Sequence, residues 1–270
     1  MEPPHGEQYE TTGAPPVRAG RRPWVVGVSG ASGTPYAAAV LRALLHAGET
    51  VDLVVSRASR LTLLDETGIS FRDAHWREDL RRWLARGADG TPDRFEASLP
   101  DLEAVRYWPA GDLAAGPSSG SYPVRGMLVV PASTASVAGI ALGLSKDLLQ
   151  RVASVTLKER RPLVMAVRET PLSGPTLRQL VALDEAGAVV LPASPAFYAG
   201  ATDIQDLVDF VAGRVLDAAG VPHKLYRRWD GALGGAAGNG TAAAGAAGGT
   251  GGTGGAAGDR PGPRTGGAGE

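Results

Sequence analysis

Short apolar runs alternate with helix-length segments through most of this chain. Residues 24–28 form an apolar, β-branched run that predicts a buried parallel strand, and residues 34–47 then place apolar side chains at helical spacing. The same reading predicts strands at 51–55, 105–108, 127–130, 163–167 and 188–191, and helices at 57–66, 76–85, 133–142, 147–160, 175–186 and 204–219. Strands that alternate with helices form parallel sheets covered on both faces, so we expect a three-layer, doubly wound α/β fold.

The two ends of the chain differ from this middle part in composition. Residues 1–22 are rich in Pro, Gly and charge, and residues 232–270 are almost entirely Gly, Ala and Thr. Such segments cannot bury enough apolar surface to offset the entropy lost on ordering. Both are predicted to be disordered, which leaves residues 23–231 as a single domain. A loop at residues 109–123, rich in Gly, Ser and Pro, is expected to be functional or mobile.

Composition argues against several classes of function. The net charge of −1 offers no basic field for nucleic acid, and the absence of cysteine excludes disulfides, thiolate metal sites and a cysteine nucleophile. No apolar run is long enough to span a bilayer, so we expect a cytoplasmic protein without a membrane partner. The four histidines are scattered without metal-ligand spacing, and no G-x-S-x-G motif supports a serine hydrolase.

Small, polar or charged residues follow most of the predicted strands at their carboxyl ends. They are Ser29–Gly33, Ser56, Pro131–Ser136, Arg168–Glu169 and Pro192–Tyr198. In a doubly wound sheet these ends meet at one edge, where ligands bind. The sequence therefore predicts one shared polar site at that edge.

The glycine pattern of the first turn favours a mononucleotide over a dinucleotide. Gly27, Gly30 and Gly33 do not form G-x-G-x-x-G, and the second strand ends in Val55-Ser56 without an acid for a ribose hydroxyl. The P-loop motif is also absent. The turn opens a helix and is predicted to bind one phosphate through backbone amides; alternatively, its glycines only allow close packing.

Several segments, taken in order, resemble the UbiX/Pad-type flavin prenyltransferases. They are Val28–Gly33, Val55–Ala58, Pro131–Thr134, Leu157–Val164, Arg168–Leu172, Pro195–Tyr198 and the closing 206–217 and 228–229. The similarity covers about residues 24–231, and its most specific part is Lys-Glu-Arg-Arg-Pro-Leu-Val followed by Arg-Glu-Thr-Pro. The chain departs from the family at Val167, where proline often precedes the Arg-Glu pair, and in its long Gly/Ala tail.

The resemblance implies a Rossmann-like or flavodoxin-like flavoprotein and a defined reaction. Reduced FMN is alkylated at N5 by dimethylallyl phosphate, a second bond closes at C6, and no metal takes part. The product is prenylated FMN, the cofactor of UbiD-type decarboxylases, which makes such a decarboxylase the expected recipient. The family assembles as a homododecamer with active sites between subunits, so we expect a homo-oligomer. Monophosphate and diphosphate donors are both compatible with the sequence.

The resemblance also implies which residues move protons. Glu169 is the best general acid or base, because a nearby phosphate raises the pKa of a carboxyl group toward neutrality. An ion pair with Arg168 or Arg151 is the alternative. Ser32 matches the serine near flavin N5 and can relay a proton, or act as a helix cap, or do both. Glu66 matches a second acidic position, although a surface charge at a helix end explains it equally well.

Cationic and hydroxyl side chains have to hold the leaving phosphate when no metal does so. Lys158, Arg168, Tyr198 and Arg214 match the family's phosphate-binding positions, and we count Lys158 also among the catalytic residues. Each charge-assisted hydrogen bond would contribute roughly 1.5–3 kcal/mol. For any single cation, a solvated surface charge is the alternative.

Aromatic faces can stabilise an allylic cation without reacting with it. Trp108 and Trp229 resemble residues that line the family's prenyl pocket, with core packing as the alternative for Trp108. Trp76 and Trp83 are expected to pack in the interior. The residues expected to hold FMN are Ser29, Gly30, Ala31, Ser32, Gly33, Ser56, Ser133, Thr134, Ala135, Ser136 and Arg151.

Two other functions remain alternatives at this point. An FMN-dependent cysteine decarboxylase would have the same fold, but it carries a catalytic histidine and Pro-Ala-Ser-Ala-Asn-Thr, whereas residues 131–136 read Pro-Ala-Ser-Thr-Ala-Ser. A non-catalytic FMN-binding partner subunit of a decarboxylase would be favoured by the loss of Lys158, Glu169 or Tyr198, and all three are present.

Overall fold

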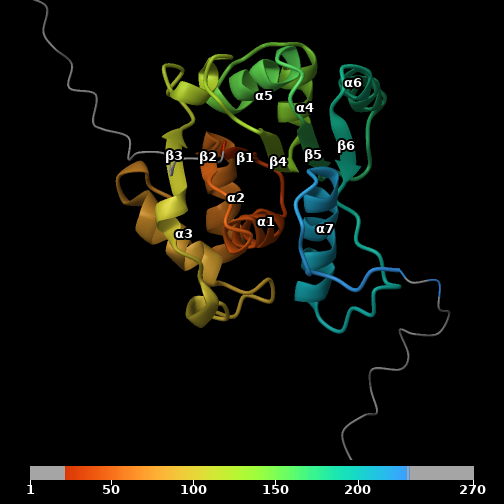
Figure 1. The fold of residues 1–270 in the computed structure, drawn as a ribbon. Coiled ribbons are helices and arrows are strands. Elements are labelled where there is room, and N and C mark those ends of the chain that lie inside the picture. The colour runs from red at the N-terminus through yellow and green to blue at the C-terminus, as the bar shows by residue number, and fades with distance from the viewer. Residues whose placement is uncertain (1–21, 230, 232–270) are drawn as a thin grey trace, which may run out of the picture. The chain divides into compact units, whose positions relative to one another are not determined.

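Six parallel strands form one sheet in the computed structural model, which describes residues 22–229 and 231 (Figure 1). The strands are β1 (Trp24–Val28), β2 (Val51–Val55), β3 (Val105–Pro109), β4 (Gly126–Ala132), β5 (Leu163–Val167) and β6 (Val189–Pro192). Their order is β3-β2-β1-β4-β5-β6, and every neighbouring pair is parallel. The chain therefore reverses its winding direction between β1 and β4, which is where a doubly wound fold binds its ligand.

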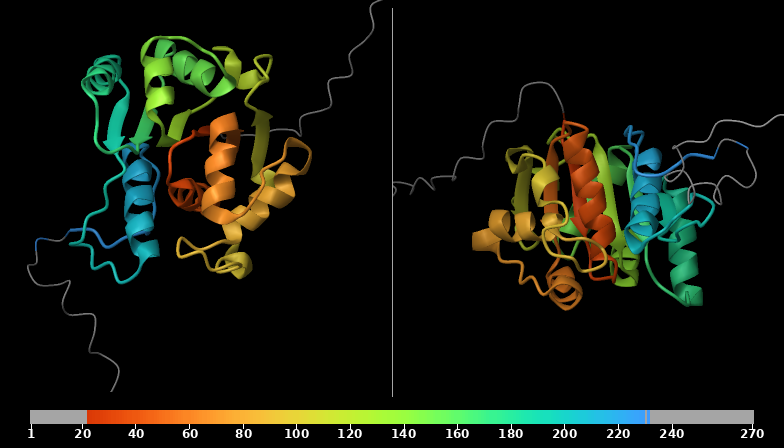
Figure 2. Two further views of the ribbon diagram at one scale, coloured as in Figure 1. Left: turned by 180° about the vertical axis from the view of Figure 1, so that it is seen from behind. Right: turned by 90° about the horizontal axis from the view of Figure 1, so that it is seen from below.

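Seven helices cover the two faces of the sheet in the described part of the chain (Figures 1 and 2). They are α1 (Thr34–His46), α2 (Arg57–Thr67), α3 (Trp76–Ala85), α4 (Thr134–Ala141), α5 (Leu148–Lys158), α6 (Gly174–Glu185) and α7 (Ile204–Ala218). In Figure 1 the first three and α7 lie on one face, and α4, α5 and α6 lie on the other. The predicted three-layer α/β fold is confirmed.

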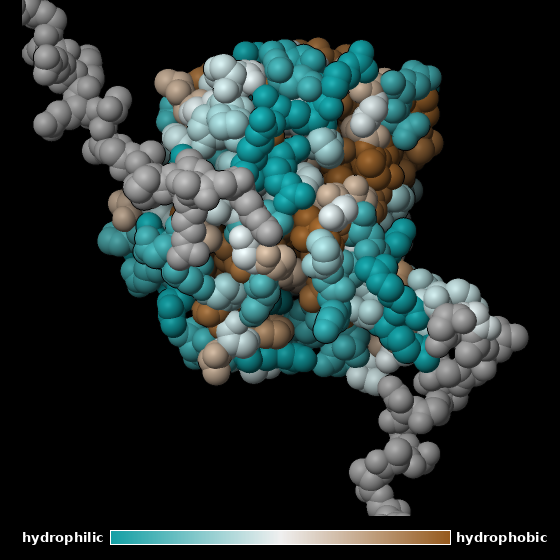
Figure 3. Space-filling model, viewed as in Figure 1, coloured by the Kyte–Doolittle hydropathy of each residue, from teal (hydrophilic) through white to brown (hydrophobic). Residues whose placement is uncertain are grey.

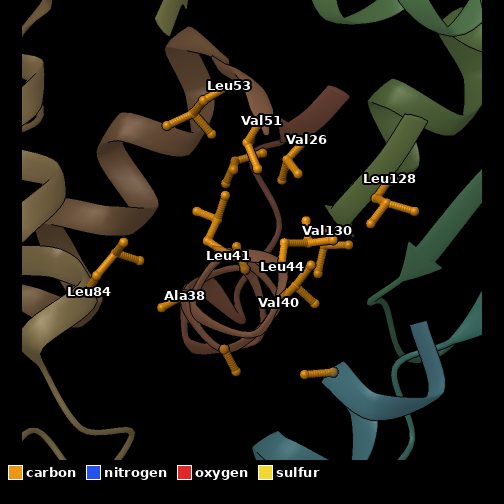
Figure 4. Packing of buried hydrophobic residues seen from close by; sticks show 14 of the residues in the cluster. Val26, Ala38, Val40, Leu41, Leu44, Val51, Leu53, Leu84, Leu128 and Val130 are labelled. Atoms are coloured by element: carbon orange, nitrogen blue, oxygen red, sulfur yellow. The ribbon is translucent and has the colours of Figure 1, made fainter. Parts of the chain in front are cut away.

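Each face of the sheet buries its own apolar cluster. On one face Val26 and Val51 pack against Leu41 and Leu44 of α1 (Figure 4). On the other, β4 and β5 pack against α5, whose Leu149 is completely buried. All residues of the central strands β1, β2, β4 and β5 are buried, so these strands read as apolar runs in the sequence, interrupted only by Asp52 in β2.

The predicted elements agree with the observed ones apart from shifts at their ends. The loop at 109–123 contains a short 3-10 turn, Gly116–Ser118, and others lie at Asp73–His75, Glu96–Ser98 and Leu102–Ala104. Trp83 is buried, as expected, while Trp76 is half-buried and stacks on Tyr107.

The segments predicted to be disordered, 1–22 and 232–270, lie outside the described residues except for Arg22. The domain limits inferred from composition therefore stay a prediction. Within residues 22–229 and 231, we find no helix with the length and apolar character needed to cross a membrane.

Candidate active site

Ser29, the first residue after β1, joins the ends of β1 and β4. Its Oγ donates to the carbonyl oxygen of Pro131 at 2.7 Å and accepts from the backbone N–H of Ser133 at 2.7 Å. The side chain is fully buried. Because its hydroxyl is engaged inside the protein, Ser29 fixes two turns of the site relative to each other and does not present that hydroxyl to the cavity.

Glu66, at the end of α2, binds the N-terminus of α1. Its carboxylate accepts from the backbone N–H groups of Gly33 and Thr34, both at 2.8 Å, and from the hydroxyl of Thr34 at 2.6 Å. Partial burial raises the pKa of Glu66, but hydrogen bonds from Thr34, Ser32 and Gly33 outweigh it, so the pKa lies below its ordinary value. Glu66 is thus a carboxylate at a helix N-terminus, where the helix dipole favours negative charge.

This contact bears on the phosphate site predicted for the turn at 29–33. The amides of Gly33 and Thr34 already bind a carboxylate, so a phosphate there would have to displace Glu66. Gly30 also packs closely, because a Cβ added to it would lie 2.5 Å from the Cβ of Ala58. The alternative interpretation, a turn whose glycines permit close packing, describes Gly30 directly.

Ser56 and Ser133 cap the neighbouring helices α2 and α4. The Oγ of Ser56 accepts from Ser59 N at 3.1 Å, and the Oγ of Ser133 accepts from Ser136 N at 3.3 Å. Each cap accepts from one backbone N–H of the first helical turn. The N–H groups before it in that turn point out of the helix end, as they do in many phosphate sites. The backbone N–H of Ser56 also donates to Val28 O at 3.0 Å, so both helix ends adjoin the end of β1.

A cavity of about 440 Å³ opens beside these turns. Four of the predicted site residues line it, namely Ser32, Gly33, Glu66 and Arg168. The Nε of Arg168 donates to the carbonyl oxygen of Ser32 at 3.1 Å, which ties the turn after β5 to the turn after β1. Apolar residues from α7 complete the wall, so the cavity combines a charged side with an apolar one.

Tyr36 lines the same cavity and was not predicted from the sequence. Burial raises the pKa of Tyr36, while the charge of Arg168 acts in the opposite direction. Its ring lies against Gly33, where an added Cβ would come within 2.7 Å of Tyr36 Cδ2 and where φ is +113°. Glycine is therefore the residue type that suits position 33 of this turn. In the sequence, Tyr36 stands near the start of a predicted helix, and nothing about that position marks it as a site residue.

Glu169 follows Arg168 and is exposed. Its Oε1 accepts from the backbone N–H of Thr170 at 3.0 Å. Within residues 22–229 and 231, Glu169 forms no ion pair with Arg168 or Arg151, which was the alternative role for this side chain. Its carboxylate thus remains available to a ligand at the carboxyl edge of the sheet.

Lys158 and Arg151 lie on α5, on the other face of the sheet. Lys158 is exposed and paired with Glu159, shortly before β5 begins, so it lies toward the amino edge of the sheet. The Nε of Arg151 donates to the carbonyl oxygen of Ser118 at 3.1 Å, in the loop at 109–123. Neither residue lines the cavity beside Ser32.

Trp108 lies on the edge strand β3, and its indole N–H donates to Oδ1 of Asp52 at 3.1 Å. The hydroxyl of Tyr122 donates to Oδ2 at 3.0 Å, and Arg106 lies 3.4 Å from Oδ1. Burial raises the pKa of Asp52, against the opposing effects of Trp108, Arg106 and Tyr122. Tyr122 thus anchors the loop at 109–123 to the sheet, Trp108 packs edge to face against it, and Trp108 does not line the cavity. The sequence analysis missed this cluster, although an acid inside an apolar strand, Val51-Asp52-Leu53, could have indicated it.

Tyr198 and Trp229 meet beyond β6. Their rings are edge to face at 5.7 Å, and Tyr198 also lies edge to face with Phe210 of α7 at 5.8 Å. Arg214, one turn further along α7, lines a second cavity of about 450 Å³ with residues of β6. Within one chain, therefore, the predicted residues form separate groups: the Ser32–Glu66–Arg168 cavity, the α5 side chains, and the aromatic and Arg214 group.

The fold and these turns define a doubly wound α/β protein with a mononucleotide-type site. A family model described as Flavoprotein matches residues 13–216. The flavin prenyltransferase UbiX of Streptomyces coelicolor is 83% identical over 214 residues, which cover 79% of this chain and 98% of that protein. The flavin prenyltransferase UbiX of Pseudomonas aeruginosa is 33% identical, with 75% of this chain and 91% of that protein covered.

Two crystal structures have a similar fold. AnUbiX, in complex with FMN and dimethylallyl pyrophosphate, gives a TM-score of 0.65 at 36% identity and covers 78% of this chain and 98% of its own. A dodecameric FMN-dependent UbiX-like decarboxylase from Escherichia coli O157:H7 gives 0.64 at 35% identity and covers 77% and 99%. The chain belongs to the flavin prenyltransferase family typified by UbiX. The predicted family, enzyme class and flavin cofactor are therefore confirmed.

The residues at the carboxyl edge also fit a flavin mononucleotide chemically. First-turn amides of α2 and α4 suit a single phosphate, and the cavity beside Ser32 offers both apolar walls and the polar side chains of Glu66 and Arg168. A second phosphate of a dinucleotide would need a further anion site, and the N-terminus of α1 is taken by Glu66.

Proposed function

We propose that this chain transfers a dimethylallyl group from dimethylallyl phosphate to N5 and C6 of reduced FMN, without a metal ion, and so makes prenylated FMN. The observation that carries this proposal is the cavity beside the turns after β1 and β5, which Ser32, Glu66 and Arg168 line together. Flavin supplies the nucleophilic atoms. The side chains of the chain bind anions, orient groups and move protons.

The phosphate of FMN would bind at the N-termini of α2 and α4, with Ser56 and Ser133–Ser136. The turn at 29–33 would instead contact the ring system, because Ser29 and the amides of Gly33 and Thr34 are engaged inside the protein. Ser32, which is exposed on the cavity wall near Glu66, would relay a proton from the flavin. Arg151 would contact the flavin of a neighbouring subunit.

The prenyl phosphate would be bound by Lys158, Arg168, Tyr198 and Arg214, with Glu169 as general acid or base. These residues lie apart in one chain, because α5 and α7 run back toward the amino edge of the sheet while Arg168 and Glu169 stand at the carboxyl edge. A site that uses all of them has to be completed by a second copy. The aromatic residues Trp229 and Trp108 would line the pocket in the same composite site.

We therefore propose a homo-oligomer, and a dodecamer as its size. Apolar side chains on and beside α6 and β6 are exposed, and the apolar surface on the right of Figure 3 lies over this region. They are Leu172, Leu177, Val181 and Val189. The dodecameric relative from Escherichia coli supports a second copy as the occupant of this surface. Light scattering coupled to size exclusion measures the assembly, and a monomer at micromolar concentration would contradict it.

The reaction is tested anaerobically with the purified protein, reduced FMN and dimethylallyl phosphate. We expect a flavin heavier by one C5H8 unit in the mass spectrum, and a parallel reaction with the diphosphate shows which donor is used. Recovery of unmodified FMN with both donors would refute the proposal. Boiled protein serves as the control for chemical alkylation of the flavin.

The product is proposed to pass to a UbiD-type decarboxylase. Adding the reaction mixture to such an apo-decarboxylase should restore its activity, whereas unreacted FMN should not. The cytoplasmic location also remains a proposal, and fractionation of cells expressing the chain tests it.

A further inference from the structure

Asp217, in the last turn of α7, accepts hydrogen bonds from four side chains. The donors are His223 Nε2 at 2.9 Å, Tyr226 Oη at 2.5 Å, Arg228 Nη2 at 2.7 Å and Arg214 Nη1 at 3.1 Å. Burial raises the pKa of Asp217, but the hydrogen bonds from Arg228, Tyr226 and His223 outweigh it and lower the pKa well below its ordinary value. The group is therefore a carboxylate at any physiological pH.

Three of these donors belong to the segment that follows α7, residues 221–229, shown in blue in Figure 1. The His223 side chain is only 3% exposed. The Tyr226 ring lies against the backbone of α7, because a Cβ added to Gly213 would come within 2.6 Å of it, and its centroid is 4.8 Å from that of Phe210. The segment thus runs back along α7 instead of leaving it.

The far end of the segment reaches the aromatic group described above. Trp229 lies edge to face with Tyr198 at 5.7 Å, and Arg227 donates to the carbonyl oxygen of Tyr198 at 3.3 Å. Trp229 and Tyr198 are 55% and 43% exposed, so neither is fixed by burial. Their meeting depends on where the rest of the segment is docked.

Asp217 also orients a cation of the proposed phosphate site. Arg214 and Asp217 line the same cavity beside β6, so the guanidinium is held at its wall. With Arg228 present as well, the cluster of Arg214, Arg228 and Asp217 keeps a net positive charge and can still attract an anion. One carboxylate is therefore linked to Arg214 directly and to Trp229 and Tyr198 through the segment.

We infer that Asp217 is a positioning residue for the prenyl donor: it orients Arg214 toward the donor phosphate and docks residues 223–229 so that Trp229 closes on Tyr198. This inference rests on the proposed function of the chain. Asp217 touches neither flavin nor donor, so its replacement should weaken donor binding without changing how flavin is bound.

The test compares Asp217→Asn with Asp184→Asn, a matched control in which an exposed acid of α6 without side-chain partners in the described chain loses its charge. For Asp217→Asn we expect the KM for dimethylallyl phosphate to rise about tenfold or more, because at least one charge-assisted hydrogen bond is lost. The kcat should stay within about twofold, and the Kd for FMN should stay that of the wild type. An unchanged KM, or a fall in kcat at unchanged KM, would overturn the inference.

Tyr226→Phe gives an independent test that keeps the packing of the ring on α7. It removes the hydrogen bond to Asp217 and the longer contact of the hydroxyl with Arg214 Nη1 at 3.4 Å, so the KM should rise in the same direction by a smaller factor. If Asp217→Asn fails to bind FMN because it does not fold, Tyr226→Phe decides alone, and an unchanged KM in that variant refutes the inference. Failure of the proposed function is distinguishable, because the wild type itself would then yield no prenylated flavin.

Discussion

Replacing Glu66 by glutamine should destabilise the protein by removing a negative charge from the N-terminus of α1. The carboxylate accepts three hydrogen bonds, two from the amides of Gly33 and Thr34 and one from the Thr34 hydroxyl. Glutamine has one carbonyl oxygen that can still accept, but its NH₂ group would face a donor and could not accept a hydrogen bond from it. At least one charge-assisted bond, about 1.5–3 kcal/mol, is lost together with the interaction of the charge with the helix dipole, about 0.3–1 kcal/mol.

Partial exposure of Glu66 reduces this sum, so we expect a loss of about 2 kcal/mol in the free energy of unfolding. For a domain of this size, that corresponds to a fall in Tm of about 4–8 °C. Thermal unfolding is followed by circular dichroism at a fixed protein concentration, because oligomerisation makes Tm depend on concentration. Asp65→Asn is the matched control, since the neighbouring Asp65 is exposed and has no side-chain partner among residues 22–229 and 231.

The pH dependence gives a second readout of the same interaction. The pKa of Glu66 is lower in the folded protein than its ordinary value of 4.5, so the folded state binds this proton less readily than the unfolded state. The stabilisation is present above pH 4.5 and is lost as the pH falls through the lowered folded pKa. The difference between wild type and Glu66→Gln should therefore shrink on acidification. Equal Tm values at pH 7, or a difference that stays constant in acid, would refute this reasoning.

Three further changes probe other parts of the site. Glu169→Gln should retain FMN binding, measured by fluorescence titration, and lose turnover; unchanged turnover would exclude Glu169 as the acid or base. Gly33→Ala should lower the free energy of unfolding in urea by about 1–3 kcal/mol, because φ is +113° and the new Cβ strikes Tyr36, and a smaller loss would contradict this geometry. Because the pKa of Asp52 is raised in the folded protein, its contribution to stability is present at low pH and lost as the pH rises through that pKa. Asp52→Asn should therefore flatten the pH dependence of the free energy of unfolding in urea. An unaltered pH profile would argue against burial as the cause of the raised pKa.

The order of the elements could be predicted from local patterns alone. Buried parallel strands are apolar on both faces and stand out as short runs, and Gly48 and the serine and aspartate caps mark where helices end and begin. The edge strand β3 had a weaker signal, because only Val105 is buried and its other residues are partly exposed. The 3-10 turns between α3 and β3 had no periodicity to reveal them.

The sequence by itself determined the fold class, the edge of the sheet at which small and polar turn residues gather, and the family, since strand runs, turn residues and ordered motifs are all local. It could not determine how the turn at 29–33 uses its polar groups. Only the tertiary structure brings Glu66 from α2 to the amides of α1 and closes Ser29 onto Pro131. These contacts join residues 33 and 102 positions apart, and a single sequence contains no period or spacing that reports such distances.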